Sequence, residues 1–258
     1  MLDTSEQILI VVPCFNEETR LRMSYWEDVI PTSKQVSWLF VDDGSTDRTV
    51  ERVEHLLKFQ NVQLYSLGKN YGKAEAIRLG LTSKLNSQFK VFGYLDADCA
   101  FLKADIFDLI SLFCAKLEVD QDLDCLIGSR VKLSGRDINR KPTRHYISRI
   151  LLTVINFNWK EAPYDTQSGF KLFRNRPVFK EVLAQKFSTK WFIDLEIFSR
   201  IIFVQKRIKI WEEPVSYWQE IPDSRISKLK IWLILVEAIF ARSLISKAVK
   251  QRGQNGLN

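Results

Sequence analysis

Long apolar runs are absent from this sequence of 258 residues, which bears on where the protein acts. The N-terminal segment 1–7 is polar, and the apolar run at 8–12 is too short for the core of an export signal. The longest later candidate, 231–236, is interrupted by Glu237 and falls short of the roughly 20 apolar residues of a spanning helix. We therefore expect a cytoplasmic protein without a membrane-spanning helix.

Cysteine and histidine are also scarce, with four and two residues respectively. No two cysteines have the spacing of a zinc ribbon, and in the cytoplasm we expect all four to be reduced thiols. His55 and His145 are isolated in the sequence, and we expect neither to be catalytic. These observations argue against a zinc ribbon and against a disulfide framework.

Motifs for nucleic-acid binding are missing, although the chain is basic. The net charge is +7, and the basic excess lies in 130–149 and from Lys171 to the C-terminus. A basic surface can serve nucleic acid, anionic lipid or a phosphorylated substrate. Because no helix-turn-helix, zinc-finger or RRM pattern accompanies the charge, we expect no nucleic-acid partner.

A glycine-rich phosphate loop is missing as well. The segment 69–73 precedes a predicted helix but lacks the pattern GxxxxGK[ST] of a Walker loop. Lys69 or Lys73 could still reach a phosphate from this position. The absence of a glycine-rich loop near the first strand argues against a nucleotidyltransferase.

The first half of the chain alternates strand and helix signals. Apolar runs predict strands at 8–12, 36–41, 62–67, 91–95 and 124–128, and helices between them at 17–29, 47–59, 72–85 and 103–117. This rhythm predicts an α/β fold with a mostly parallel central sheet and helices on both faces. Further along we expect a loop at 131–142, a helix at 143–158, strands at 169–173 and 208–211, and a helix at 224–251. We therefore expect one domain over 1–222 and a basic amphipathic tail over 223–258.

Two aspartates follow the predicted strand at 91–95 directly. Asp96 and Asp98 emerge at the carboxyl end of this strand, where open α/β sheets bind their ligands. Two acids one residue apart repel each other unless a cation or a cluster of donors compensates their charge. A divalent cation shared with a diphosphate would do so, because hard cations prefer oxygen ligands. A solvated pair in a turn is the alternative.

Acidic residues also end the first two predicted strands. The first strand leads into 12–18, which contains Glu17, and the second ends in Asp42 and Asp43. Acids at two neighbouring strand ends form a crevice of hydrogen-bond acceptors, which suits the N–H groups of a base and the hydroxyls of a ribose.

These motifs, in their order and spacing, resemble the large family of inverting nucleotide-sugar glycosyltransferases called family 2, which has the GT-A fold. The likeness is carried by VPCFNEE (12–18), VDDGSTD (41–47), KNYGKAEAIRLG (69–80) and DADCA (96–100). Three downstream segments resemble the polyprenyl-phosphate sugar synthases, and the dolichyl-phosphate β-glucosyltransferases in particular: GSR (128–130), DTQSGFKLF (165–173) and KWFIDLE (190–196). The likeness covers about residues 7 to 245.

The resemblance implies a site for a nucleotide sugar, with UDP-glucose as the expected donor. The residues expected to hold this donor are Pro13, Phe15, Glu17, Asp42, Asp43, Asp96, Ala97 and Arg225. Lys73 is included with them because its charge could reach a phosphate. Asp96 and Asp98 would hold Mg²⁺ or Mn²⁺ against the diphosphate. Mannose-transferring relatives often place a Gln two residues after the second Asp, where this chain has Ala100, as in the glucose branch. The metal would therefore have fewer protein ligands here.

The resemblance also implies that the acceptor is a polyprenyl phosphate, such as dolichyl phosphate. Arg130, Arg144 and Ser148 match positions that bind the lipid phosphate. A phosphate monoester has its second pKa at about 6, so it is largely dianionic at neutral pH and needs no general base. Direct displacement builds negative charge on the departing nucleoside diphosphate, which the metal and Arg225 would stabilise. The expected catalytic residues are thus Asp98, Arg130 and Arg144, together with Asp194.

Two other functions remain open at this point. A family 2 transferase that glycosylates a saccharide hydroxyl would need a base, and Asp194 or Glu196 would be the candidates. A non-catalytic protein that binds a nucleotide sugar is the second alternative, although the intact Asp96 and Asp98 argue against it.

Two predicted helices could lie on a membrane surface. One is 147–159, and the other is 226–250, in which apolar residues alternate with Lys and Arg. Basic amphipathic helices bind anionic interfaces in this way. We therefore expect peripheral association with the cytoplasmic face of a membrane. Packing on the domain, or contact between the subunits of a homodimer, is the alternative role of these helices.

Overall fold

The structure, a computed structural model, describes residues 7–85, 88–139, 152–153, 159, 161–190, 192–221 and 228–254. Of residues 228–235 and 252–254 it describes the backbone alone. Most of the helix expected at 143–158 lies outside the described residues, as do Arg144, Ser148 and Arg225. The expected domain boundary at 222–223 lies outside them too.

A seven-stranded sheet forms the centre of the molecule, with the strand order β3-β2-β1-β4-β7-β5-β8. Its strands are β1 (Ile8–Cys14), β2 (Val36–Asp42), β3 (Val62–Ser66), β4 (Val91–Leu95), β5 (Cys125–Ser129), β7 (Phe170–Arg174) and β8 (Ile210–Pro214). Strand β7 runs antiparallel to its neighbours β4 and β5, and the other neighbouring pairs are parallel. The prediction of a mostly parallel sheet is therefore confirmed.

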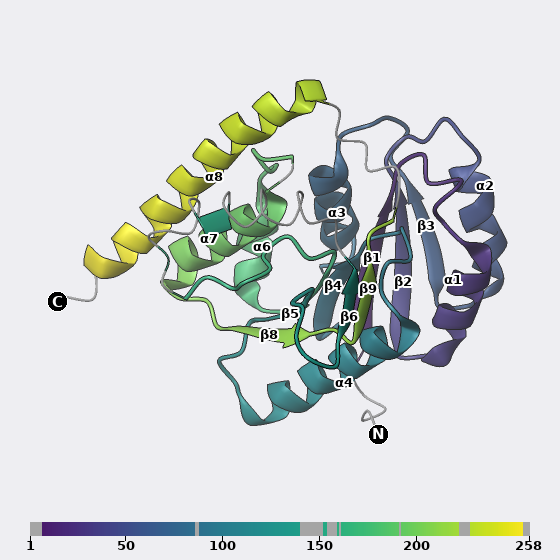
Figure 1. Cartoon of the computed structure of the whole chain (residues 1–258), viewed down its shortest axis with the longest axis horizontal. Coiled ribbons are helices and arrows are strands. Elements are labelled where there is room, and N and C mark those ends of the chain that lie inside the picture. The colour runs from purple at the N-terminus through teal and green to yellow at the C-terminus, as the bar shows by residue number, and fades with distance from the viewer. Residues whose placement is uncertain are drawn as a thin grey trace.

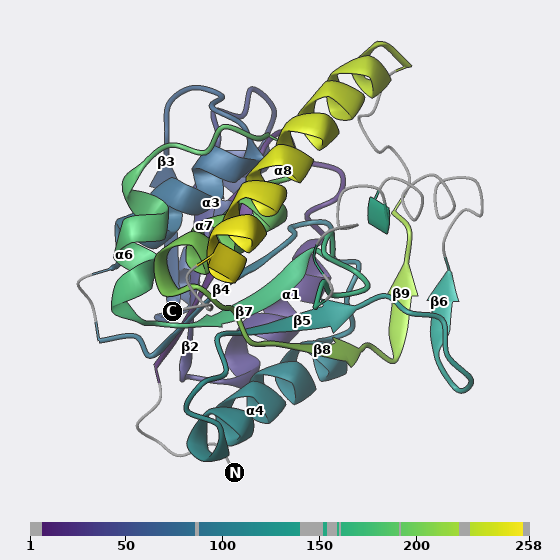
Figure 2. The ribbon, with the colours of Figure 1, turned by 90° about the vertical axis from the view of Figure 1, so that its left-hand side faces the viewer.

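Helices cover both faces of this sheet, as the sequence predicted (Figures 1 and 2). One face packs against α1 (Met23–Val29), α2 (Thr49–Glu54) and α4 (Lys103–Val119), and the other against α3 (Lys73–Thr82), α6 (Pro177–Ala184) and α7 (Ile193–Gln205). Single turns of 3₁₀ helix, η1 (Ile30–Thr32) and η2 (His55–Lys58), extend α1 and α2. The last helix, α8 (Lys228–Gln254), lies across α7.

The two cores explain why the central strands are apolar at every position. In β1, Ile8 and Ile10 pack toward α1 and α4, whereas Leu9 and Val11 pack toward α3. All four side chains are buried, as expected for a parallel strand that is covered on both faces.

The first helix begins later than the sequence predicted. Helical periodicity suggested a start at Glu17, but α1 begins at Met23. The backbone N–H groups of Glu17 and Glu18 are instead bonded to Thr49, the first residue of α2, and to Asp47 in the loop before it. These tertiary bonds hold the segment before α1 in an irregular turn.

A second, two-stranded sheet lies beside the first, and it was not predicted from the sequence. It consists of β6 (Asp137–Asn139), within the expected loop at 131–142, and β9 (Tyr217–Gln219), which pair in parallel. Strands of three residues carry too little alternation to be recognised in a sequence, and their partners are distant in the chain.

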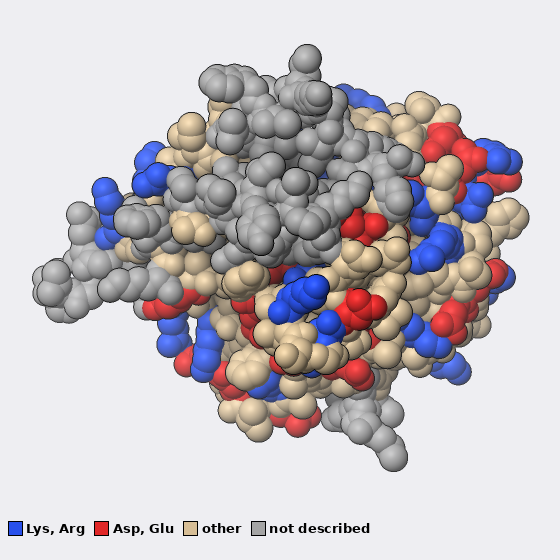
Figure 3. Space-filling model, in the orientation of Figure 1, with Lys and Arg blue, Asp and Glu red and all other residues tan. Residues whose placement is uncertain are grey.

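The face shown in Figure 3 carries both signs of charge. Over the described part of this face, the side chains of Lys and Arg are interleaved with those of Asp and Glu. Among the described helices, none is both long and apolar enough to cross a membrane.

Candidate active site

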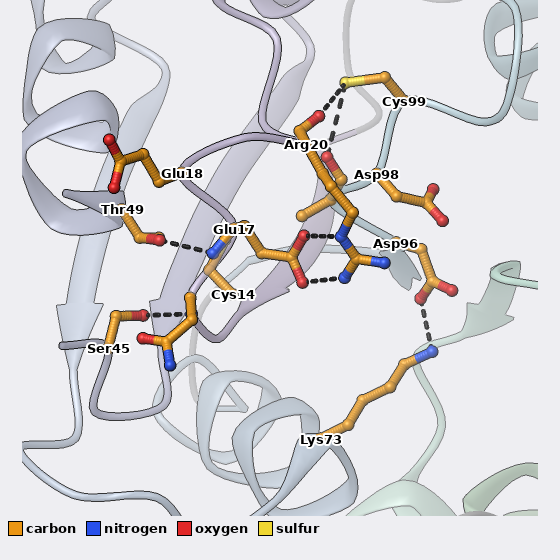
Figure 4. Close-up of polar contacts among 12 residues, drawn as sticks. Cys14, Glu17, Glu18, Arg20, Ser45, Thr49, Lys73, Asp96, Asp98 and Cys99 are labelled. Atoms are coloured by element: carbon orange, nitrogen blue, oxygen red, sulfur yellow. Dashed lines mark hydrogen bonds and ion pairs between the residues drawn. The ribbon is translucent and has the colours of Figure 1, made fainter. Parts of the chain in front are cut away.

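The candidate site lies at the carboxyl ends of the parallel strands β2, β1 and β4. Strand β1 has β2 on one side and β4 on the other, so the direction in which the chain adds strands reverses between them. A reversal of this kind leaves a crevice beyond the strand ends, where α/β proteins bind ligands. Figure 4 shows Glu17, which follows β1, near Asp96 and Asp98, which follow β4.

The loops after β1 and β2 are bonded to each other. Glu17 donates its backbone N–H to Thr49 Oγ1 at 2.6 Å, and Glu18 donates its N–H to Asp47 Oδ2 at 3.1 Å. Asp42 accepts a bond of 3.1 Å from the N–H of Ser45. These bonds fix the backbone on one side of the crevice.

Asp43 holds the loop that leads into α3. Its Oδ1 accepts the N–H of Tyr71 at 2.7 Å and its Oδ2 accepts the N–H of Gly72 at 2.8 Å. Burial raises the pKa of Asp43, although these two bonds act against the rise. The adjacent Gly44 has φ +72°, and a Cβ there would lie 2.5 Å from the backbone of Lys69. Asp43 and Gly44 therefore position the first residue of α3.

Asp96 is fitted closely against the strand beside it. Its N–H donates to the carbonyl of Gly169 at 2.9 Å. A Cβ at Gly169 would lie 2.5 Å from Asp96 Oδ2, a distance that real Cβ atoms do not reach. Only glycine at position 169 leaves room for the Asp96 carboxylate. Ala97, the residue after Asp96, is buried.

Lys73, the first residue of α3, extends to Asp96 (Figure 4). Its Nζ lies 2.5 Å from Asp96 Oδ1, and the two side chains are 46% and 30% exposed. Burial lowers the pKa of Lys73, but the Asp96 carboxylate outweighs this and raises the pKa overall.

Asp98 shares the negative field of Asp96. Burial, together with the charge of Asp96, raises the pKa of Asp98 to about 6, while Arg20 and Lys73 act in the opposite direction. Asp98 also accepts the N–H of Ala100 at 3.2 Å.

Glu17 holds an arginine over the two aspartates. Arg20 Nε donates to Glu17 Oε2 at 2.7 Å, and its Nη2 donates to Glu17 Oε1. Burial lowers the pKa of Arg20, but Glu17, with smaller contributions from Asp98 and Asp96, raises it overall. Figure 4 shows the guanidinium between Glu17 and the aspartate pair. No role was predicted for Arg20 from the sequence, although it stands three residues after Glu17.

Asp96 and Asp98 are the residues that could hold a divalent cation. Among the described residues, no group of three or more His, Cys, Asp or Glu side chains is placed so that it could hold a metal ion by itself. The pair nevertheless fits a hard cation that shares its coordination with a diphosphate and water. Asp96 Oδ1 is buried, and the Lys73 ammonium, 2.5 Å away, is the positive charge beside it in this structure.

Arg130, the residue after β5, is bound on one side by a buried carboxylate. Its Nε and Nη2 each donate to Asp165 at 2.7 Å, and Nη2 also donates to the carbonyl of Gln167 at 2.8 Å. The guanidinium lies 5.1 Å from the ring centroid of Trp218. These contacts fix its plane, and none of them uses Nη1.

A buried lysine and aspartate lie beneath the site. Lys171 is fully buried, and its Nζ lies 2.9 Å from Asp194 Oδ1 and 2.6 Å from the carbonyl of Ser168. The hydroxyl of Tyr94 donates to Asp194 Oδ1. Burial raises the pKa of Asp194 to about 8 and lowers the pKa of Lys171 to about 7. To act as a base, Asp194 would first have to part from both partners.

Glu196, the other candidate base, is buried in a set of structural bonds. It accepts the N–H of Thr189 at 2.8 Å and the Thr189 hydroxyl at 2.9 Å, and it pairs with Arg200 at 2.7 Å. These bonds attach the segment before α7 to the helix itself.

The structure brings most of the predicted donor-site residues together. Pro13 and Phe15 are half-buried at the end of β1, the predicted acids follow the ends of β1, β2 and β4, and Lys73 contacts Asp96. The contacts made by Arg20, Gly169 and Asp165 were not predicted from the sequence. Asp165 and Gly169 nevertheless belong to the recognised motif DTQSGFKLF (165–173).

Comparison with known proteins identifies the family. Residues 9–183 match the model of the family described as glycosyl transferase family 2. A dolichyl-phosphate beta-glucosyltransferase of Trichomonas vaginalis is 32% identical over 231 residues, which are 86% of this chain and 68% of that protein. The dolichyl-phosphate beta-glucosyltransferase of Saccharomyces cerevisiae is 28% identical over 84% of this chain and 68% of its own length.

Solved structures agree on the fold. The glucosyl-3-phosphoglycerate synthase of Mycobacterium tuberculosis, crystallised with Mn²⁺, UDP-glucose and phosphoglyceric acid, superposes with a TM-score of 0.64 at 15% identity. The match covers 94% of this chain and 80% of that one. The prediction of the GT-A fold is confirmed, and this chain is a glycosyltransferase that belongs to glycosyl transferase family 2.

Proposed function

We propose that the protein transfers glucose from UDP-glucose to a polyprenyl phosphate, with inversion at the sugar carbon. The observation that carries the proposal is the arrangement of Asp96 and Asp98 between the cations Lys73 and Arg20 at the strand ends. Carboxylates for a metal, flanked by cations for phosphates, suit a nucleoside diphosphate as the leaving group. The sugar and the acceptor follow from the similarity to dolichyl-phosphate beta-glucosyltransferases, and the base from the UDP-glucose complex of the structural neighbour.

On this proposal, the residues of the crevice divide between binding the donor and stabilising its departure. A bound Mg²⁺ or Mn²⁺ would neutralise charge on the diphosphate. Asp42 and Asp43 lie on the side of the base and ribose, while Lys73, Arg20 and Arg225 supply positive charge as the sugar–phosphate bond breaks.

The acceptor phosphate would approach from the side of Arg130. Asp165 orients the guanidinium by two bonds, which leaves Nη1 for the phosphate. Arg144 and Ser148 would complete this acceptor site. A dianionic phosphate attacks without a base, so Asp194 can remain paired with Lys171 during transfer. A hydroxyl acceptor would require Asp194 to be released.

We also propose that α8 meets the surface of a membrane. Small residues of this helix pack against α7, namely Ala238, Ala241 and Ala248 together with Ile245. Three larger apolar residues of the helix are exposed instead, with Val236, Ile239 and Phe240 at 49%, 71% and 42% exposure. Exposed basic residues follow on the same helix: Arg242, Lys247 and Lys250. An outward apolar face beside basic side chains suits an anionic lipid interface.

A single assay tests the reaction. Purified protein with Mn²⁺ is offered UDP-glucose, UDP-galactose or GDP-mannose, each with a short polyprenyl phosphate or with free sugars. Mass spectrometry should detect glucosyl polyprenyl phosphate from UDP-glucose, with a β linkage by NMR, and no product with Asp98→Ala. A glycosylated free sugar without any lipid-linked product would overturn the proposed acceptor.

A further inference from the structure

Lys73 pairs with one of the two carboxylates that would hold a divalent cation. Its Nζ lies 2.5 Å from Asp96 Oδ1, and the two groups form an ion pair. The same oxygen is the one that a divalent cation would engage. An ammonium and a divalent cation against one oxygen repel each other, so each weakens the contact that the other makes.

The structure fixes the base of Lys73 and leaves its end free to move. Asp43 binds the N–H groups of Tyr71 and Gly72 directly before it, so the start of α3 has a fixed place. The lysine side chain is 46% exposed and ends in a flexible four-carbon stem. Its ammonium can therefore leave Asp96 without any change in the backbone.

The charges around Asp96 favour movement of the Lys73 ammonium from this carboxylate toward a bound diphosphate. Glu17, Asp96 and Asp98 carry three negative charges, and Arg20 and Lys73 carry two positive ones. A divalent cation in this group produces a net positive charge, with the ammonium displaced from its carboxylate. An anionic diphosphate then supplies the new partner that the ammonium needs.

We propose that Lys73 and the divalent cation are alternative partners of Asp96, and that this exchange couples metal binding to nucleotide binding. The inference depends on the proposed use of a nucleoside diphosphate donor. Metal alone binds weakly because it must displace Lys73 from Asp96. With the nucleotide present, the displaced ammonium binds phosphate, so each ligand strengthens the other by the same factor.

Binding measurements on three variants test the exchange. The affinity for Mn²⁺ is measured by electron paramagnetic resonance and calorimetry, with and without UDP, in the native chain, Lys73→Gln and Lys73→Arg. We expect UDP to tighten Mn²⁺ binding by ~10- to 100-fold in the native chain, a usual range for coupled sites. In Lys73→Gln, Mn²⁺ alone should bind several-fold tighter and the effect of UDP should fall by ~10-fold, whereas Lys73→Arg should retain the coupling.

Lys84→Gln is the matched control, because it removes the same charge just beyond the other end of α3. It should bind both ligands like the native chain. Thermal unfolding shows whether each variant is folded. If Lys73→Gln binds Mn²⁺ no tighter and keeps the full effect of UDP, the exchange is wrong while the proposed function stands. If the native chain binds neither Mn²⁺ nor UDP, both proposals fall.

Discussion

Gly169 shows how a single residue can decide the geometry of the site. Its carbonyl accepts the N–H of Asp96, and its missing side chain leaves the space that the carboxylate fills. In Gly169→Ala, the new methyl would overlap the carboxylate, so Asp96 must turn away from the crevice. We expect Mn²⁺ affinity in the presence of UDP to fall by ~10-fold or more, as for the loss of an orienting contact at a metal site.

Gly135 offers the opposite case for comparison. It has φ +78°, and a Cβ there would meet no atom within 4 Å. Gly135→Ala should therefore lower stability through backbone strain, by about 1 kcal/mol, and leave the binding of Mn²⁺ and UDP unchanged. Equal losses of Mn²⁺ affinity in the two variants would contradict the role given to Gly169.

The buried pair of Lys171 and Asp194 makes a second prediction at this scale. Lys171→Met removes the cation beside the buried Asp194, which typically costs about 3–5 kcal/mol where that carboxyl is ionised. The double variant Lys171→Met/Asp194→Asn keeps a partner for Tyr94 and removes the charge, so it should recover part of the loss. Urea unfolding measures both. A single variant within about 1 kcal/mol of the native chain would show that the pair stabilises little.

Among the elements, the strands were predictable and several contacts were not. Continuous apolar runs marked β1, β2 and β4 because both faces of each strand are buried. The start of α1 was missed because bonds from a loop about 30 residues away hold 17–22 out of the helix. The antiparallel course of β7 was also not expected, since nothing in a single strand reveals the direction of its neighbours.

In the candidate site, too, some residues were predictable from the sequence and their contacts were not. Its acids were found because they end buried strands, which is a local signal. The contact of Lys73 with Asp96, and that of Arg130 with Asp165, join residues that are distant in the sequence. Such pairs depend on the order of strands in the sheet, which a single sequence does not provide.

Among the helices and strands, α8 allows a direct test of membrane binding. If its outward face meets lipid, Ile239→Ser/Phe240→Ser should lose most of its cosedimentation with vesicles that contain anionic phosphatidylglycerol. Binding should also weaken with salt, because part of it is electrostatic. Val119→Ser is the control, since Val119 is 84% exposed at the end of α4. Unchanged sedimentation of the double variant, together with dissociation of a dimer by ultracentrifugation, would assign the face to a subunit contact instead.

At the scale of the whole molecule, ligand binding should raise the free energy of unfolding and therefore Tm. The site joins loops from β1, β2 and β4 with the start of α3, so a ligand that bridges them stabilises the folded chain over the unfolded one. A ligand at 100 times its Kd contributes about 2.7 kcal/mol. For a chain of this size, that gain corresponds to a rise in Tm of roughly 5–10 °C.

Comparing Tm with UDP and Mn²⁺ separately and together shows whether the metal and the nucleotide bind as a unit. UDP with Mn²⁺ should raise Tm, while UDP with EDTA and Mn²⁺ alone should each raise it much less, because the metal and the diphosphate share the aspartate pair. Asp98→Asn should fold and lose the rise, since one of the two carboxylates is then neutral. A rise of the same size with EDTA present would mean that the nucleotide binds without the metal. In that case Lys73 and Arg20 alone would hold the diphosphate, and Asp96 would serve as the anchor of Lys73 rather than as a ligand of the cation.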